Sequence, residues 1–259
     1  MTKDRGLELL NELIREGRTT VSASEVRTAM GLTPQATSNL LHRLTSAGLV
    51  DRVAAGRYAI RQLGTLGTAA VWDDLGSAIG ALFAPHPHRI GFLTALDLHG
   101  LLVRPVLPVQ VASPFRTREK FLSGRPLRVI HESDVTVLIG TQPFGPSRLA
   151  TVERALLDTA SRPQLTGGAA RLAEALVATR ATSGLRDLAQ QVGDIAAYRR
   201  IGSISSTLLM EVAKGLEPLQ WRTLIELDRR ARGKGGWVDT TWGVAWPYSR
   251  SELEAVFAS

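Results

Sequence analysis

The sequence contains no cysteine in its 259 residues. Without thiols, the chain has no disulfide framework, no thiolate zinc site, no iron–sulfur cluster and no cysteine nucleophile. Long apolar runs are missing too, because none approaches the roughly 18 residues that a membrane-spanning helix needs. The first turns of the chain are charged and periodic, unlike a secretory signal peptide. We therefore expect a cytoplasmic protein that does not act at a membrane.

Signatures of catalysis and of cofactor binding are also missing. The Gly-Gly pair at 167–168 lacks the lysine of a phosphate-binding loop, and no serine lies in a Gly-x-Ser-x-Gly turn. The Gly-Ser pair at 202–203 is not followed by the paired carboxylates of a nucleotidyltransferase. His86 and His88 alternate across an extended proline turn, which directs their rings to opposite sides and disfavours a shared metal ion. The sequence therefore predicts a protein that is not an enzyme and that has no cofactor or metal.

The charge of the chain is unbalanced, with 31 Lys and Arg against 24 Asp and Glu, a net charge of +7. Almost all of these cations are arginine, whose guanidinium donates in a two-pronged fork that suits phosphates and guanine edges. A GC-rich genome also raises the arginine content, and the 24 glycines fit that explanation. Charge alone therefore leaves both a polyanionic partner and a genomic bias open.

The first sixty residues alternate short helices and strands. Apolar residues recur at helical spacing near the start, and glycines separate the periodic segments. Thr33 has the residue type of a helix N-cap, and Pro34 suits the first helical position, where its missing N–H has no consequence. The pattern predicts a helix over 3–15, an extended piece at 19–21, a second helix capped by Ser22 or Ser24 and ended by Gly31, a third helix from 34 to about 47, and strands at 49–53 and 57–60.

This order is that of a winged helix-turn-helix domain, which we place at 1–63. The segment "GLTPQATSNLLHRLTSAGLVDRV", residues 31–53, resembles the turn, recognition helix and wing of that family of DNA-binding domains. A three-helix module used for protein contacts is the alternative. The core residues expected from the pattern are Leu10, Ile14, Val26, Ala29, Met30, Leu40, Leu44 and Val50.

The third helix has two distinct faces. Thr37, Leu40, Leu41 and Leu44 recur at the spacing of one helical face and are expected to pack on the first two helices. The outward residues include amides that pair with adenine, and the arginines of the helix and wing suit phosphates, although each arginine is as readily explained as a solvated surface charge. The predicted DNA-binding residues are Gln35, Ala36, Ser38, Asn39, His42, Arg43, Arg52 and Arg57.

The remainder of the chain, 66–259, is predicted to be one larger domain that follows a hinge containing Gly64 and Gly67. Helical patterns alternate with extended apolar pieces, and no connection is long enough for repeated helical crossovers, which indicates a mixed sheet. The fold class expected is α+β: a winged helix-turn-helix followed by a mixed α/β domain. The pattern predicts helices at 72–83, 90–101, 151–161, 169–178, 185–199, 205–215, 218–232 and from 251, and extended pieces at 101–111, 127–131 and 135–141.

Two segments of this region resemble the AbiEi family, the antitoxins of AbiE-type abortive-infection systems. The segments are "FLTALDLHGL" at 92–101 and "ATVERALLDTASRPQLTGG" at 150–168. With the winged helix, the resemblance spans nearly the whole chain. It implies an antitoxin of a type IV toxin–antitoxin pair whose winged helix binds inverted repeats in double-stranded operator DNA and represses its own operon.

The resemblance also implies a functional partner, a nucleotidyltransferase-like toxin that the C-terminal domain neutralises, classically without a stable complex. The last third of the chain matches no family motif by residue, so the antitoxic surface has no assigned residues. Two alternatives stay open at this point: a protein-interaction module whose winged helix docks a partner, and a transcriptional regulator that is not an antitoxin. An enzyme with an unrecognised site is the least favoured reading.

Several polar and aromatic residues of the second region have structural interpretations. His99 ends a predicted helix, where an imidazole commonly binds the last carbonyls. Asp158, with Glu153 and Arg154, is expected in a local set of ion pairs on a helix whose buried stripe includes Leu156. Four aromatic residues crowd one loop near the C-terminus, and we expect them to pack the domain rather than form a partner surface: Trp237, Trp242, Trp246 and Tyr248.

Overall fold

The computed structural model describes residues 2–61, 75–118, 120–122, 125–179, 183–228, 236–249 and 252. By its contacts the chain divides into two compact units. Unit 1 comprises Met1–Arg89, Leu107–Val137 and Pro143–Arg148, and unit 2 comprises Ile90–Val106, Leu138–Gln142 and Leu149–Ser259. The expected hinge glycines, Gly64 and Gly67, lie outside the described residues, and so does the helix expected from residue 251 onwards apart from residue 252. The division at 63–66 stays a prediction.

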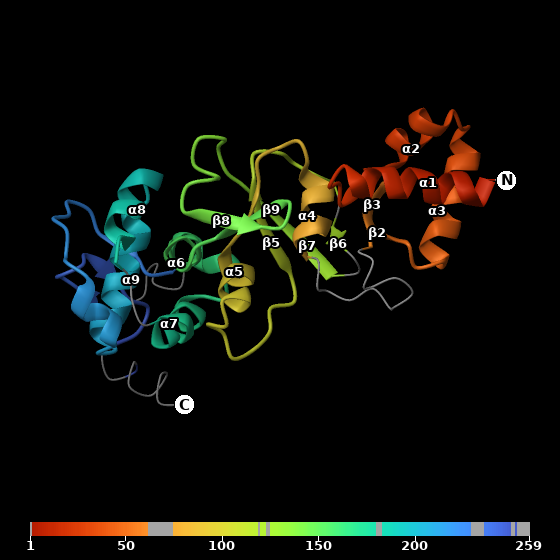
Figure 1. The fold of residues 1–259 in the computed structure, drawn as a ribbon. Helices are drawn as coiled ribbons and strands as arrows, with labels where there is room; N and C mark the ends of the chain where they lie inside the picture. The colour runs from red at the N-terminus through yellow and green to blue at the C-terminus, as the bar shows by residue number, and fades with distance from the viewer. Residues whose placement is uncertain are drawn as a thin grey trace. The chain divides into compact units, whose positions relative to one another are not determined.

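Unit 1 begins with a winged helix (Figure 1). Its three strands form an antiparallel sheet in the order β1-β3-β2. Every element expected in this segment is present and in the predicted order. The elements are α1 (Thr2–Arg15), β1 (Thr20–Ser22), α2 (Ala23–Met30), α3 (Pro34–Ser46), β2 (Val50–Ala54) and β3 (Arg57–Ile60).

Local hydrogen bonds set the ends of these helices. Ser22, rather than Ser24, caps α2: its hydroxyl accepts from the Glu25 N–H at 3.1 Å, and the Glu25 carboxylate accepts from the Ser22 N–H at 2.6 Å. Gly31 ends α2 with φ of 62°, a left-handed conformation that glycine adopts without strain. Thr33 caps α3 through the Ala36 N–H at 3.3 Å. These caps confirm the predicted boundaries.

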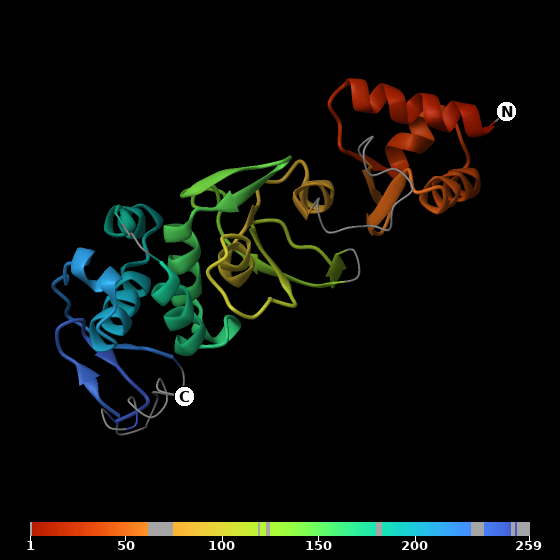
Figure 2. The ribbon, with the colours of Figure 1, turned by 60° about the horizontal axis from the view of Figure 1, so that its bottom comes forward.

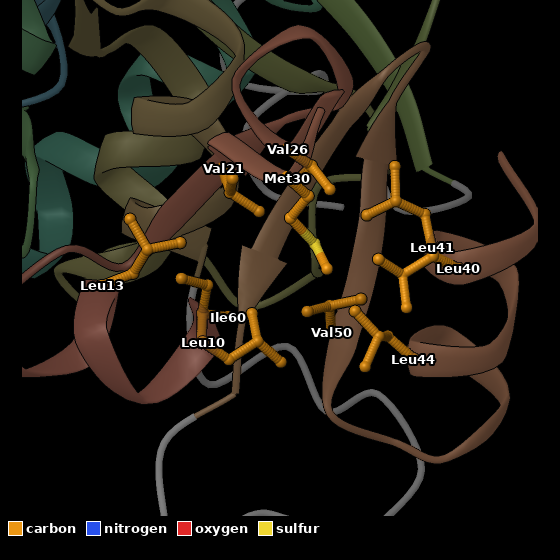
Figure 3. Close-up of a cluster of buried hydrophobic side chains, with 10 residues drawn as sticks. All are labelled: Leu10, Leu13, Val21, Val26, Met30, Leu40, Leu41, Leu44, Val50 and Ile60. Atoms are coloured by element: carbon orange, nitrogen blue, oxygen red, sulfur yellow. The ribbon is translucent and has the colours of Figure 1, made fainter. Parts of the chain in front are cut away.

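The core of the winged helix is formed by side chains from all three helices and all three strands (Figure 3). The prediction of a core position is wrong for two residues, because Ile14 is 36% exposed and Ala29 is also exposed. Leu13 takes the place of Ile14, since the buried face of α1 passes through Gly6, where a side chain would lie 3.0 Å from a methyl of Leu40. The buried cluster consists of Leu10, Leu13, Val21, Val26, Met30, Leu40, Leu41, Leu44, Val50 and Ile60.

A six-stranded mixed sheet follows, in the order β6-β7-β5-β4-β9-β8. The pair β5·β7 is parallel over five residues, β4·β9 is parallel, and β6·β7 is antiparallel. The mixed character predicted from the connection lengths is confirmed. The strands are β4 (Arg89–Ile90), β5 (Val109–Ser113), β6 (Phe121–Leu122), β7 (Arg125–His131), β8 (Thr141–Phe144) and β9 (Ser147–Ala150), and the boundary between the units runs through β4, β8 and β9.

The extended pieces were only partly predicted. The strand expected at 135–141 is wrong: residues 134–140 form turns, with Val135 81% exposed and Gly140 at φ of 68°. The expected helix at 90–101 is shorter, because Ile90 belongs to β4 and α5 spans Phe92–Leu98. The expected 101–111 strand is confined to β5, and β8 and β9 were missed, since the sequence Pro-Phe-Gly-Pro at 143–146 interrupts them.

Helix α4 (Leu75–Phe83) is buried at all nine of its residues. Two glycines bring other backbone close to it: a Cβ at Gly76 would lie 2.6 Å from the Phe144 carbonyl oxygen, and one at Gly80 would lie 3.0 Å from the ring of Pro146. The Ser147 hydroxyl donates to the Gly76 carbonyl at 2.7 Å. The turn between β8 and β9 is therefore closely packed on α4.

His88 is joined to the same serine in the interior of unit 1. Its Nε2 lies 3.0 Å from the Ser147 hydroxyl, and its Nδ1 lies 2.9 Å from the His86 carbonyl oxygen. The Ser147 hydroxyl donates its hydrogen to Gly76, so it can only accept from His88. The His86 carbonyl also only accepts. A neutral imidazole carries one N–H, so both contacts are hydrogen bonds only when the ring is protonated. Burial nevertheless lowers the pKa of His88, and the hydrogen bond to His86 opposes this only in part.

Unit 2 is mainly helical (Figure 2, with α5 in yellow and the later helices from green to blue). Two short 3₁₀ helices, at Pro163–Leu165 and Glu211–Gly215, connect longer segments. A small sheet in the order β10-β12-β11 lies near the C-terminus, with β10·β12 parallel and β11·β12 antiparallel. Besides α5 the elements are α6 (Val152–Ser161), α7 (Ala169–Ala178), α8 (Leu185–Val192), α9 (Ile195–Thr207), β10 (Ile225–Glu226), β11 (Val238–Asp239) and β12 (Val244–Ala245).

Three of the helices predicted in this unit need correction. The helix expected at 185–199 is two helices, because Gly193 adopts φ of 73° and Asp194 caps α9 through the Ala197 N–H. The helix expected at 205–215 is mostly the end of α9 and a 3₁₀ turn. The helix expected at 218–232 is wrong where the structure describes it: its backbone pairs with β12, and the carbonyl of Thr223 accepts from Arg199 at 3.0 Å.

Two of the four C-terminal aromatic residues, Trp242 and Trp246, pack the interior of the domain as predicted, and Trp237 and Tyr248 are half-buried. Trp242 and Trp246 are each 1% exposed, and each buried indole N–H has a partner. Trp242 Nε1 donates to the Ser206 hydroxyl at 3.1 Å, and Trp246 Nε1 donates to the Ser203 hydroxyl at 2.9 Å. Ser203 in turn donates to Asp239 at 2.6 Å. No helix in the described part of the chain is both long and apolar enough to cross a membrane.

Candidate nucleic-acid interface

Helix α3 is fixed by one buried face. Thr37, Leu40, Leu41 and Leu44 are all at most 6% exposed, as predicted from their spacing. The Thr37 hydroxyl also donates to the Thr33 carbonyl at 2.9 Å, so the polar group in this face has a partner. Because its orientation is set by packing, α3 presents a defined opposite face to the solvent.

That outward face carries the side chains of α3 that are predicted to bind DNA. Gln35, Ser38, Asn39, His42 and Arg43 are exposed, and Ala36 is half-buried. The Gln35 amide donates to the Asn39 amide oxygen at 3.2 Å across one helical turn. A bidentate contact with adenine needs one amide to supply both a donor and an acceptor, and Asn39 still has its NH2 group and the second lone pair of its Oδ1 for this purpose. Their roles in DNA binding stay predictions.

A shallow depression lies along the same face. Its volume is about 540 Å³, and its lining combines apolar and polar side chains. A lining of both kinds suits the methyl groups of a nucleic acid beside its polar edges. The lining residues are Leu32, Ala36, Asn39, Leu40, His42 and Arg43, four of which belong to the predicted DNA-binding set.

The two predicted wing arginines have different surroundings. Arg52, in β2, is exposed. Arg57, in β3, is half-buried, and its Nη1 donates to the Ala81 carbonyl at 2.6 Å and lies 3.5 Å from the Ala84 carbonyl. The phosphate contacts predicted for both residues stay predictions, but only Arg52 has a guanidinium exposed in the manner that the prediction assumed.

An ion pair that sequence reasoning missed closes the base of the wing. Arg61 donates to both oxygens of Asp51, from Nε and Nη2, each at 2.7 Å. The hydrogen bond to Asp51 raises the pKa of Arg61, against the effect of its burial. The sequence signal for this pair was an acidic residue, Asp51, in one predicted strand and a basic residue, Arg61, directly after the next one. This fork holds β2 and the end of β3 in register.

A second ion pair supports α2. Arg18 donates to Glu25 at 2.6 Å, while Glu25 also accepts from the Ser22 backbone. Partial burial by itself would raise the pKa of Glu25, but the hydrogen bonds from Ser22 and Arg18 together lower it. Glu25 thereby holds the start of α2 through both oxygens of its carboxylate.

Comparison with known proteins agrees with this geometry. Residues 7–57 match the MarR family model. The match covers α1 to the start of β3, so the N-terminal domain is a winged helix of the kind found in transcriptional regulators that bind double-stranded DNA. No curated protein sequence matches the chain.

One solved structure resembles nearly the whole chain. The crystal structure of the RV2827C protein from Mycobacterium tuberculosis is 16% identical in sequence, with a TM-score of 0.62 over 97% of this chain and 94% of that one. At this identity the likeness shows a shared fold. The resemblance to AbiEi proteins has no support from these comparisons beyond the winged helix and stays a prediction.

The two segments that carry that resemblance lie together in unit 2. Helices α5 and α6 are in contact, and His99 Nε2 donates to the Ala150 carbonyl at 2.8 Å. The expected contact of His99 with the carbonyls of its own helix is therefore wrong, because the ring bridges the two segments. The bridge joins the end of the first segment to the first residue of the second.

Helix α6 is buried around most of its circumference rather than along one stripe. Arg154 donates to Asp158 at 2.9 Å and to the Ile139 carbonyl at 3.1 Å, with both charged side chains at most 6% exposed. The predicted pairing of Arg154 with Asp158 is confirmed. In the ranges that the structure describes, no three His, Asp or Glu side chains gather as metal ligands.

Proposed function

We propose that this protein is a transcriptional repressor in which α3 enters the major groove of an operator and the wing contacts the adjacent phosphates. The observation that carries the proposal is the two-sided α3 within a MarR-type winged helix. Its buried face fixes the helix, and its outward face offers two amides, a histidine and an arginine. The partner is double-stranded DNA with inverted repeats, and the action is binding rather than catalysis.

We further propose that unit 2 carries an antitoxic activity of the AbiEi type against a nucleotidyltransferase-like toxin encoded next to this gene. Support comes from the two family-like segments, which pack together through α5, α6 and the bond from His99 to Ala150. The buried stretches of these segments, 92–96 and 154–160, organise the domain, so a surface that meets or counteracts the toxin would be formed by other, exposed residues of unit 2.

One pair of experiments tests both parts with the full chain. Fluorescence anisotropy compares binding to the promoter of its own operon with binding to a scrambled duplex of equal length. Co-expression with the neighbouring open reading frame, scored by growth, tests neutralisation. Promoter-specific binding with rescue of growth supports the proposal. Rescue of growth without DNA binding would favour a protein-interaction module, and specific DNA binding without rescue would leave a regulator that is not an antitoxin.

A further inference from the structure

We infer that Arg57 positions the wing by binding the C-terminal end of α4, and that it makes no phosphate contact. The consequence for DNA binding rests on the proposed function, whereas the contact itself belongs to the folded protein. The two arginines of the wing therefore have separate tasks. Arg52 faces the solvent, and Arg57 is turned to the protein.

The contact has the chemistry of a helix C-cap. The last carbonyls of a helix lack N–H partners within it, and the helix dipole gives that end a partial negative charge. Arg57 Nη1 donates to the Ala81 carbonyl at 2.6 Å, within the last turn of α4, and lies 3.5 Å from the carbonyl of Ala84 just beyond it. A guanidinium satisfies both needs of this end, a donor and a positive charge.

The rest of the wing sheet is also in contact with α4. This helix contacts β1, β2 and β3, all within unit 1. Val53 and Ala59 are 3% and 9% exposed but lie outside the core cluster of the winged helix. Helix α4 contacts the strands that carry both residues and therefore acts as a second packing surface for the sheet.

Helix α4 is itself held on another side. The close approaches of Phe144 to Gly76 and of Pro146 to Gly80 leave no room for it to shift towards the β8–β9 turn. The hydrogen bond from Ser147 to the Gly76 carbonyl fixes its first turn. Arg57 thus ties the wing to a helix that is closely packed on another side, and the direction of the wing follows from that helix.

The test uses full-length Arg57→Ala and Arg57→Lys, with Arg52→Ala as the matched control from the same wing. Hydrogen exchange of the amides in β2 and β3 is measured on the free protein. Anisotropy titrations on the operator are then repeated over a range of salt concentrations, at a temperature where all variants are folded.

For Arg57→Ala we expect exchange in the wing to accelerate about tenfold, the equivalent of one lost hydrogen bond of about 1.4 kcal/mol. Operator affinity should fall several-fold with an unchanged slope of log affinity against log salt, and Arg57→Lys should restore part of both. Arg52→Ala should leave exchange unchanged and reduce the magnitude of the slope by about one.

Three results would overturn the inference. A slope reduced by Arg57→Ala as much as by Arg52→Ala would make Arg57 a phosphate contact. Unchanged exchange in the wing would show that the bond to α4 does not hold it. Faster exchange with unchanged operator affinity would reduce the contact to a purely structural one. If the wild-type protein binds no operator, the proposed function fails, and the exchange measurement still decides whether Arg57 anchors the wing.

Discussion

The Arg154–Asp158 pair of α6 offers a quantitative test of whether the AbiEi-like segment is structural. Asp158→Asn keeps the size of the side chain and removes its charge. Arg154 then stays 3% exposed with its partner carboxylate gone, although its bond to the Ile139 carbonyl persists. Breaking a buried pair from one side typically destabilises a protein by about 3–5 kcal/mol. We expect a loss in that range in the unfolding of unit 2.

Urea denaturation followed by circular dichroism measures this loss, with tryptophan fluorescence reporting on unit 2, where Trp242 and Trp246 are buried. The double variant Arg154→Met with Asp158→Leu is the control, because apolar replacement of a whole buried pair is often close to neutral. The double variant should be clearly more stable than Asp158→Asn. A loss below about 1 kcal/mol for Asp158→Asn would refute the reasoning and reopen a functional role for the carboxylate.

Three further predictions concern pH, packing and charge. Burial lowers the pKa of His88 below its unfolded value near 6.5, so the unfolded state binds more protons. The free energy of unfolding should therefore fall as the pH drops below about 6.5, by at most about 1.4 kcal/mol per pH unit. Denaturation between pH 7.5 and 5.5 should show a shallower pH dependence for His88→Gln. Gly202→Ala should lower the midpoint of thermal unfolding, because the added Cβ would overlap the Trp242 indole. Overpacking costs about 1–3 kcal/mol, which exceeds the gain of about 0.5–1 kcal/mol from the helix preference for alanine. A raised midpoint would contradict the close packing. Arg43→Ala should weaken operator and random duplexes equally and reduce the salt slope by about one in anisotropy titrations, and a loss confined to the operator would make Arg43 a base contact instead.

The winged helix was predictable because its signals are local. The Ser22 cap, the Thr33-Pro34 start and the glycine at 31 each act within one turn of the chain, and the spacing of Leu40, Leu41 and Leu44 specifies a single buried face. Even there, the choice between Leu13 and Ile14 depended on which face of α1 meets α3, which periodicity alone does not decide.

The errors lie where distant contacts override local preference. Residues 218–228 have a helical pattern, yet they pair with β12 and their carbonyls accept from arginines of α9. The phosphate contact predicted for Arg57 is untested, but its hydrogen bond to α4 was not foreseen, because only the fold brings α4 next to it. The predicted outward face of α3 needed no such contact, so sequence and structure agree there.

Asn39 provides the most direct test of the central claim, that α3 reads an operator. The measurement compares wild type, Asn39→Ala and the control Ser46→Ala, which alters an exposed residue at the far end of α3, on the operator and on a scrambled duplex. For Asn39→Ala we expect a loss of about 1–3 kcal/mol on the operator and much less on the scrambled duplex, with Ser46→Ala unchanged on both. Equal losses on the two duplexes, or no loss on either, would contradict base reading by α3.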